Sequence, residues 1–317
     1  MNGRRNYMNH HDLLDQYFAR LKKELSSKFT KDHRMLIAST FLSLEEQFNE
    51  DQFFEQYEVA HKNNKWYSVD RMYPIIPITY VFYSLNGERT YEELKSLRDL
   101  TKQSKFKQSP YAQLQSVLIN KNSPKEHTMN AAELYNDFRS RHMFLTGGED
   151  YTNSFLLTKN STKSIESLGK VSRLYYDELC KNGFSKGDNL QTASQFLTYL
   201  SNDYIEMIPQ YVGSIQESFA KQTKIKSMMA PFFALLAMIE VNEEDITYIS
   251  SVYNEIMESF KMSWYKESSF AAAVLLGILA KEHPMKKEVL EIYRAHILCS
   301  LIPQQIIQRQ SSSNAAT

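Results

Sequence analysis

The residues best suited to chemistry are six polar side chains in two segments about 40 residues apart. They are the acidic pair Glu149 and Asp150, followed later in the chain by Asp188, Gln191, Ser194 and Gln195. If the two segments lie in adjacent helical units, packing brings equivalent positions to within roughly 10 Å. Carboxylates held that close could bind a divalent cation or a cationic group of a partner. We predict that these six residues form a ligand- or partner-binding site.

A structural interpretation competes with this prediction. Acidic residues at the start of a helix interact favourably with the helix dipole, and Asp and Asn are common capping residues. Glu149, Asp150 and Asp188 could therefore do no more than stabilise two helix starts. The two interpretations differ in whether the carboxylates converge.

Other signatures of catalysis or metal binding are missing from the sequence. The eight histidines form no HxxxH or HExxH pair, and there is no GxSxG, Walker A or GxGxxG motif. We therefore assign no catalytic residue, no metal ligand and no cofactor. Lys95, Arg98 and Lys102 are spaced to share a helix face, which is either a solvated surface or a patch for an acidic partner.

Charge and hydropathy exclude several classes of protein. Lys plus Arg number 37 and Asp plus Glu also 37, so the basic excess typical of a nucleic-acid-binding protein is missing. The longest apolar stretches, 228–239 and 270–280, are too short to cross a bilayer, which takes about 20 residues. No apolar signal segment follows the polar N-terminus, and the two cysteines, Cys180 and Cys299, are not in a CxxC pair. We expect a cytoplasmic protein with no membrane partner.

The elements that would position the six residues are helices. Only nine glycines occur in 317 residues, and apolar side chains recur at steps of three and four, as at Ile246, Ile249, Tyr253 and Ile256. Such amphipathic segments alternate with shorter, almost wholly apolar ones such as 270–276. A helix that is apolar on most sides is covered on most sides. The pattern therefore predicts outer amphipathic helices paired with inner buried ones.

The pairs recur with a period of about 40 residues. A large apolar or aromatic residue stands between the two helices of each pair, and we expect it to pack between them. These anchors are Phe29, Trp66, Phe106, Phe144, Phe184, Ile225 and Trp264. The regular spacing predicts an all-α fold of about seven stacked helical hairpins, similar to an α-solenoid.

The C-terminal region predicts a further helix and a tail. Residues 289–301 have the pattern of a closing helix that ends at Pro303, and the small polar residues after it favour disorder. We predict one all-α domain over 1–308 and a disordered tail over 309–317. Whether the helical array stays open or curls into a globule is left undecided by the pattern.

One segment resembles a known family. The run from Phe184 to Gln191, followed by Ser194, and the segment Phe144–Thr146 with its following acidic pair resemble the bacterial family of domain of unknown function 4003. The likeness extends over about residues 10–300. Members of that family often have a His after the Ser, where this chain has Gln195. The resemblance implies an all-helical cytoplasmic protein and carries no activity.

These patterns together favour a binding or scaffold protein that is not an enzyme. We predict that it recognises a peptide or protein in the groove lined by the inner helices, with a small molecule as another candidate ligand. The alternative is an enzyme with a polar or cation-binding pocket in the hollow formed by the third and fourth hairpins. A long open groove would favour binding, and a deep pocket with converging ionisable groups would favour catalysis.

Overall fold

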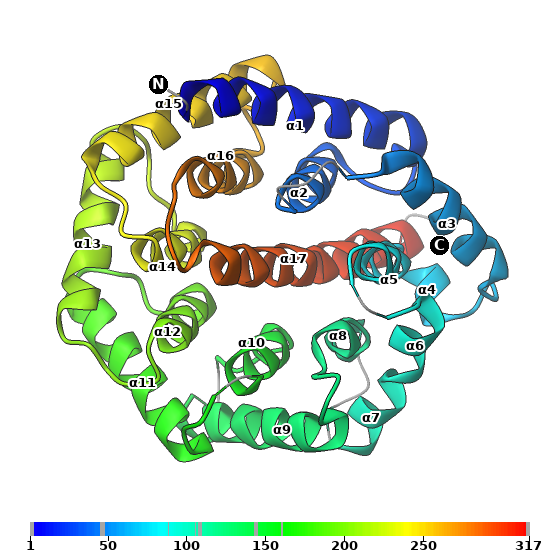
Figure 1. The fold of residues 1–317 in the computed structure, drawn as a ribbon, viewed down its shortest axis with the longest axis horizontal. Helices are drawn as coiled ribbons and strands as arrows, with labels where there is room; N and C mark the ends of the chain where they lie inside the picture. Colours follow the sequence, from blue (N-terminus) through cyan, green and yellow to red (C-terminus); the bar gives the residue numbers. More distant parts are fainter. Residues whose placement is uncertain are drawn as a thin grey trace.

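The computed structural model describes residues 3–44, 48–87, 89–104, 106, 110–142, 145–159 and 161–314. Every regular element in these ranges is an α-helix or a 3-10 helix, so the prediction of an all-α protein is confirmed. None of these helices combines the length and the apolar character needed to span a bilayer. The helices form two concentric layers around one central helix (Figure 1).

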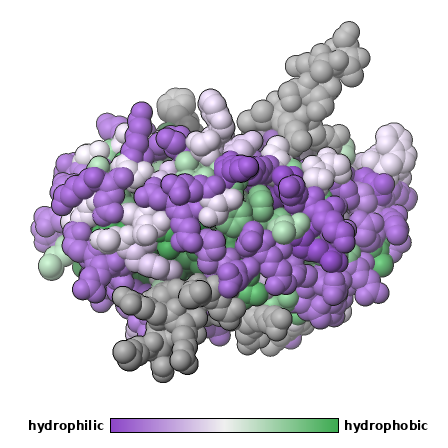
Figure 2. All heavy atoms as spheres, turned by 90° about the horizontal axis from the view of Figure 1, so that it is seen from above, coloured by the Kyte–Doolittle hydropathy of each residue, from purple (hydrophilic) through white to green (hydrophobic). Residues whose placement is uncertain are grey.

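The outer layer is built from amphipathic helices that run around the rim (Figure 1). Ile246, Ile249 and Ile256, for example, are buried on one face of α15. Seen edge-on, the rim is covered mainly by hydrophilic side chains (Figure 2). The outer helices are α1 (Gly3–Leu25), α3 (Glu50–Asn63), α6 (Tyr91–Ser96) with α7 (Arg98–Gln103), α9 (Pro124–Arg141), α11 (Ile165–Lys181), α13 (Met207–Ala220) and α15 (Glu243–Ser259).

The inner layer consists of the more apolar helices, which Figure 1 shows nearly end-on. They are α2 (Lys31–Leu42), α5 (Ile75–Leu85), α8 (Pro110–Gln115), α10 (Glu149–Thr158), α12 (Asp188–Leu200), α14 (Ala230–Met238) and α16 (Lys266–Ala280). Short elements join some pairs: α4 (Val69–Met72), η1 (Ser116–Leu118) and η2 (Ser227–Met229). Each inner helix contacts the outer helix that precedes it in the chain.

The two ends of the array meet, so the layers form a closed ring. Helix α16 of the last pair contacts both α1 and α2 of the first pair. Phe18 of α1 packs edge-on against Phe260, with ring centroids 5.1 Å apart. The array therefore curls into a globule and does not remain an open solenoid. Closure covers the apolar side faces that terminal units of an open array would expose.

Helix α17 (Lys286–Asn314) crosses the middle of the ring (Figure 1). It contacts α2, α5, α8, α10, α14 and α16. Its side chains Val289, Ile292, Tyr293 and Leu301 are fully buried. The groove that the sequence predicted for a peptide is therefore not open, because the chain's own last helix occupies it.

The end of α17 differs from the sequence prediction. Pro303 lies inside the helix and does not end it. Proline in a helix removes one backbone donor and crowds the carbonyl four residues before it, so it was expected to end the helix, yet α17 continues through it. Residues 309–314 of the predicted tail are helical, whereas 315–317 lie outside the described residues. The domain boundary at residue 308 thus falls within a helix.

The anchors separate into buried and exposed residues. Phe29, Phe106 and Phe184 are buried as predicted, and Phe144 lies outside the described residues. Trp66 and Trp264 are 82% and 89% exposed, so the prediction that they pack between helices is wrong. In the last pair the buried residues of this loop are Phe260 and Met262, which pack in place of Trp264.

Candidate functional site

The six predicted site residues lie on the fourth and fifth helix pairs, one pair later than the sequence count placed them. Glu149 and Asp150 open α10, and Asp188 opens α12. The two helices contact each other side by side. The amide of Gln191 reaches back to the Thr146 hydroxyl before α10, with 3.4 Å between nitrogen and oxygen.

Three of the six residues form one buried network. Gln191 and Gln195 donate their side-chain amides to Asp150 Oδ1 over 2.7 and 2.6 Å. The backbone amide of Gly147 donates to Asp150 Oδ2 over 2.7 Å, and Asn153 donates to Gln195 Oε1. The three groups that donate hydrogen bonds to the Asp150 carboxylate are therefore all uncharged. The network ties α10 to α12 and caps the start of α10.

The environment of Asp150 changes its acidity. Burial raises the pKa of this carboxyl to about 6, and the hydrogen bonds from Gln195, Gly147 and Gln191 only partly oppose that rise. A buried charge without a cationic partner is costly, whereas donors to the charged form offset part of the cost. Near pH 7 the carboxylate is ionised but poorly compensated.

The pKa of Asp150 leads to a testable pH dependence. In the folded protein Asp150 stays protonated up to about pH 6, whereas the ordinary pKa of an Asp carboxyl is 3.8. Ionisation of this group therefore reduces stability as the pH rises from about 4 to about 6, by roughly 3 kcal/mol. We expect Asp150→Asn to abolish this fall in the free energy of unfolding. Urea unfolding of wild type and variant at about pH 4 and pH 7 measures it.

A control separates this effect from general pH dependence. Asp188→Asn changes an exposed carboxylate and should leave most of the wild-type difference in place. If wild type and Asp150→Asn lose the same free energy of unfolding between the two pH values, Asp150 is not the buried acid described above.

The other three residues do not join the network. Asp188 is exposed, and burial of part of its surface raises its pKa. Ser194 donates to the Gln191 carbonyl and lies 3.3 Å from the Ser172 hydroxyl of α11. Glu149 accepts a hydrogen bond from the Tyr111 hydroxyl. The structure thus brings Asp150, Gln191 and Gln195 together, and the carboxylates do not meet in one cluster.

Metal binding finds no geometric support in the described part of the chain, where no three His, Cys, Asp or Glu side chains are placed to hold an ion. The basic helix face noted in the sequence is occupied by local partners. Arg98 pairs with Asp70 at 2.7 Å, Lys102 with Asp99 at 2.6 Å, and Lys95 donates to Asn64.

Sequence reasoning missed a hollow beside α17. Its volume is about 200 Å³, and its walls come from α2, α12, η2, α14, α16 and α17. The polar side chains that line it are Asp32, Asn189, Tyr265, Glu267, Ser268, His296, Ser300 and Gln304, and its apolar wall includes Leu36, Met228, Phe232 and Ile297. These residues come from distant parts of the sequence.

The polar groups of this hollow include a neutral imidazole. His296 lies edge-on to Phe196 and Phe232, with ring centroids 5.4 and 5.6 Å away. Burial lowers the pKa of His296 to about 4, so the ring is uncharged near pH 7. Glu267 forms an ion pair with Lys226, and Asp32 accepts a hydrogen bond from the Thr30 hydroxyl. The hollow thus offers hydrogen-bond acceptors next to an apolar wall.

A periodic pattern of polar residues in the sequence could have indicated part of this hollow. Asp32, Asp150, Asn189 and Glu267 are each the second residue of an inner helix. Asn189 follows Asp150 by 39 residues, and Glu267 follows Asn189 by 78, or two periods. Polar residues at equivalent positions of stacked units lie at the same end of the ring. His296 and Gln304 had no such signal, because α17 is not one of the paired inner helices.

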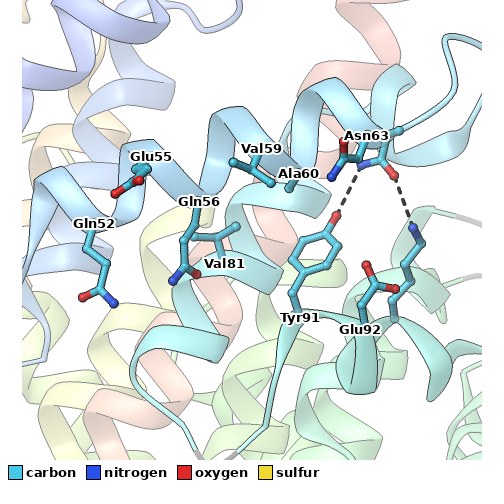
Figure 3. Close-up of a pocket in the computed structure, with 11 residues that line it drawn as sticks. Gln52, Glu55, Gln56, Val59, Ala60, Asn63, Val81, Tyr91 and Glu92 are labelled. Carbon is cyan, nitrogen blue, oxygen red and sulfur yellow. Dashed lines mark hydrogen bonds between the residues drawn. The ribbon is translucent and has the colours of Figure 1, made fainter.

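A second, larger hollow lies on the outside of the ring, between α3 and α6. It measures about 430 Å³, with Val81 and Ala60 at its base and the polar side chains Gln52, Gln56 and Asn63 along α3 (Figure 3). The Asn64 amide donates to the Tyr91 hydroxyl over 3.3 Å and so closes one end. This groove is open to solvent and is lined mainly by uncharged groups.

Comparison with known proteins gives the family. A family model described as protein of unknown function (DUF4003) matches residues 17–307. The chain belongs to the DUF4003 family. It is also 24% identical over 284 residues to the uncharacterized protein YeaA of Bacillus subtilis (strain 168), covering 86% of this chain and 84% of that protein. No solved structure matches the chain.

Proposed function

We propose that this DUF4003 protein binds a small molecule in the hollow beside α17. The observation that carries the proposal is the convergence of side chains from six elements on one partly enclosed space. Binding sites are typically concave and combine apolar walls with placed polar groups, and the hollow joins an apolar wall to eight polar side chains. Its volume of about 200 Å³ is below the ~300–1,000 Å³ of sites for drug-sized ligands.

The lining indicates the chemistry of the ligand. The carboxylates of Asp32 and Glu267 and the uncharged ring of His296 can accept hydrogen bonds, while Phe232 and Leu36 offer apolar contact. A ligand with one donor-rich or cationic end and a short apolar body fits this arrangement. A bulky anion fits poorly, because it would meet the two carboxylates.

Binding is favoured over catalysis by the state of the polar groups. The alternative prediction placed an enzyme pocket between α10 and α12. There the side chains of Asp150, Gln191 and Gln195 bond to one another. They therefore fill the space that a substrate would need. In the hollow beside α17, His296 is neutral near pH 7 and is too weak a base to hold a proton there.

A peptide or protein partner remains a second candidate, at a different place from the one predicted. The outer groove between α3 and α6 is the larger hollow, and it is open along its length (Figure 3). Its free amide side chains could bond to an extended peptide backbone. We propose this groove, and not the ring interior, for any peptide ligand.

We also infer that the ring is a tandem repeat of about 40 residues and that the protein is cytoplasmic. The equivalent places of Asp32, Asp150, Asn189 and Glu267 support the repeat. Cys180 and Cys299 are both free thiols, which suits a reducing compartment.

The proposal is tested by filling the hollow. Ser300 lines it from α17, and its hydroxyl donates to the Ile297 carbonyl over 2.8 Å. We expect Ser300→Leu to weaken at least tenfold the binding of compounds selected on the wild type. The selection uses a library of small amines and alcohols, with ligand-observed NMR as the readout and titration calorimetry for affinity.

The matched control is Ser140→Leu. Ser140 is exposed on α9 and makes the same type of bond, to the Asp137 carbonyl over 2.7 Å. This variant should bind the selected compounds as the wild type does. Compounds that bind both variants and the wild type equally would place the site elsewhere.

A further inference from the structure

The two ends of the ring differ in charge. We use the name loop face for the end formed by the described residues of the segments that lead from each outer helix to the next inner helix: 26–30, 64–74, 104, 106, 142, 145–148, 182–187, 221–229 and 260–265. The one acid among their described residues is Asp70, which is buried and paired with Arg98. They carry the cations Lys28, Lys65, Arg71, Lys186, Lys221, Lys224, Lys226 and Lys261.

The opposite end is mixed in charge. The described residues of its connecting segments carry both signs in nearly equal number: Arg89, Lys121, Lys159, Lys163 and Lys281 against Asp203, Glu206, Glu240 and Glu282. A chain with no net charge thus concentrates lysine at one end of its ring. Carboxylates near the loop face stand on the helices behind it: Asp32, Glu149 and Glu267 are half-buried at the starts of α2, α10 and α16, and Asp188, Glu24 and Glu258 are exposed at helix ends.

Contacts near the loop face join several of its neighbouring segments. Lys31 donates to the Lys261 carbonyl over 3.0 Å, which joins the first segment to the last. Lys226 pairs with Glu267 at the start of α16. Asn189 and Met228 line the same hollow, and Tyr111 bonds Glu149 across the starts of α8 and α10.

The same face carries the exposed aromatic residues. The chain has two tryptophans, Trp66 and Trp264, and both lie on the loop face with more than four-fifths of their surface exposed. Tyr67 and Met228 are also exposed there. Burying an indole normally gains free energy, so two solvated indoles on a basic surface indicate a contact made outside the chain.

We propose that the loop face docks on an anionic membrane surface. Lysines attract acidic headgroups, and tryptophan prefers the boundary between headgroups and acyl chains. A planar surface can contact both tryptophans at once, although they stand on the second and seventh pairs with α1 and α2 between them. A single nucleic-acid strand would have to follow the ring to stack on both. This proposal departs from the sequence expectation of no membrane partner, which rested on the lack of a spanning segment, because a surface contact needs no spanning helix.

Vesicles test this inference, and the tryptophans report on it. We expect sedimentation with phosphatidylcholine vesicles that contain roughly one-third phosphatidylserine, and a blue shift of the tryptophan emission. Vesicles of phosphatidylcholine alone should bind little. Each lysine near such a surface contributes about fivefold in affinity, so the triple variant Lys221→Gln, Lys224→Gln, Lys261→Gln should bind about 100-fold more weakly.

The control removes the same charge from other surfaces. Lys163, Lys170 and Lys287 lie away from the loop face, and their triple Gln variant should bind vesicles as the wild type does. Binding that is absent, indifferent to phosphatidylserine or equal in the two triple variants overturns the proposal. The proposal would also be overturned if the protein bound a short DNA duplex more tightly than the acidic vesicles and the loop-face variant lost that binding. The surface would then be assigned to nucleic acid.

Discussion

Tyr293→Ala should lower the free energy of unfolding by about 3–5 kcal/mol, the range for truncating a buried large aromatic side chain. Tyr293 lies in the first third of α17, is fully buried, and donates its hydroxyl to the Ala271 carbonyl of α16 over 3.0 Å. Its ring also contacts Phe232 of α14. The truncation would leave a cavity where the central helix meets the inner layer, and urea unfolding followed by circular dichroism measures the loss.

Tyr293→Phe is the matched control for this prediction. It keeps the ring and removes only one hydrogen bond, so it should cost about 1 kcal/mol. Equal effects of the two substitutions would mean that the ring is not packed as described. A stability close to wild type for Tyr293→Ala would contradict the central position of α17.

Phe184→Ala should lower the free energy of unfolding by a similar ~3–5 kcal/mol. Phe184 is buried and packs against Phe233 at 6.4 Å between ring centroids. It follows Gly183, which has a φ of 86° and ends α11. The Phe184 amide then bonds the Leu179 carbonyl, so the reversal of the chain directs the ring into the core.

The control for Phe184 comes from the same series of anchors. Trp264 stands in the corresponding segment of the last pair but is exposed, so Trp264→Ala should change stability by less than about 0.5 kcal/mol. Chemical unfolding of both variants at one temperature makes the comparison. Equal losses would contradict the difference in burial between the two anchors.

The site was only partly predictable from the sequence. Spacing brought Asp150 and Gln191 into one group, because neighbouring helix pairs place corresponding residues side by side. Spacing could not show that neutral amides would surround Asp150, since that depends on side-chain directions in the packed interior. Nor could it find His296, which reaches the hollow from a helix that belongs to no repeat.

The sequence by itself determined the helices and their pairing. Steps of three and four along each segment depend on local geometry, and the capping boxes at Thr90–Glu93 and Asn242–Asp245 formed as their residues predict. Buried Phe29 and Phe184 followed from the same local pattern. Only the tertiary structure decided that α16 meets α1 and α2, that α17 fills the ring, and that Trp66 and Trp264 face solvent. Ring closure depends on small rotations between successive pairs, which accumulate over the whole chain and leave no mark in any single repeat.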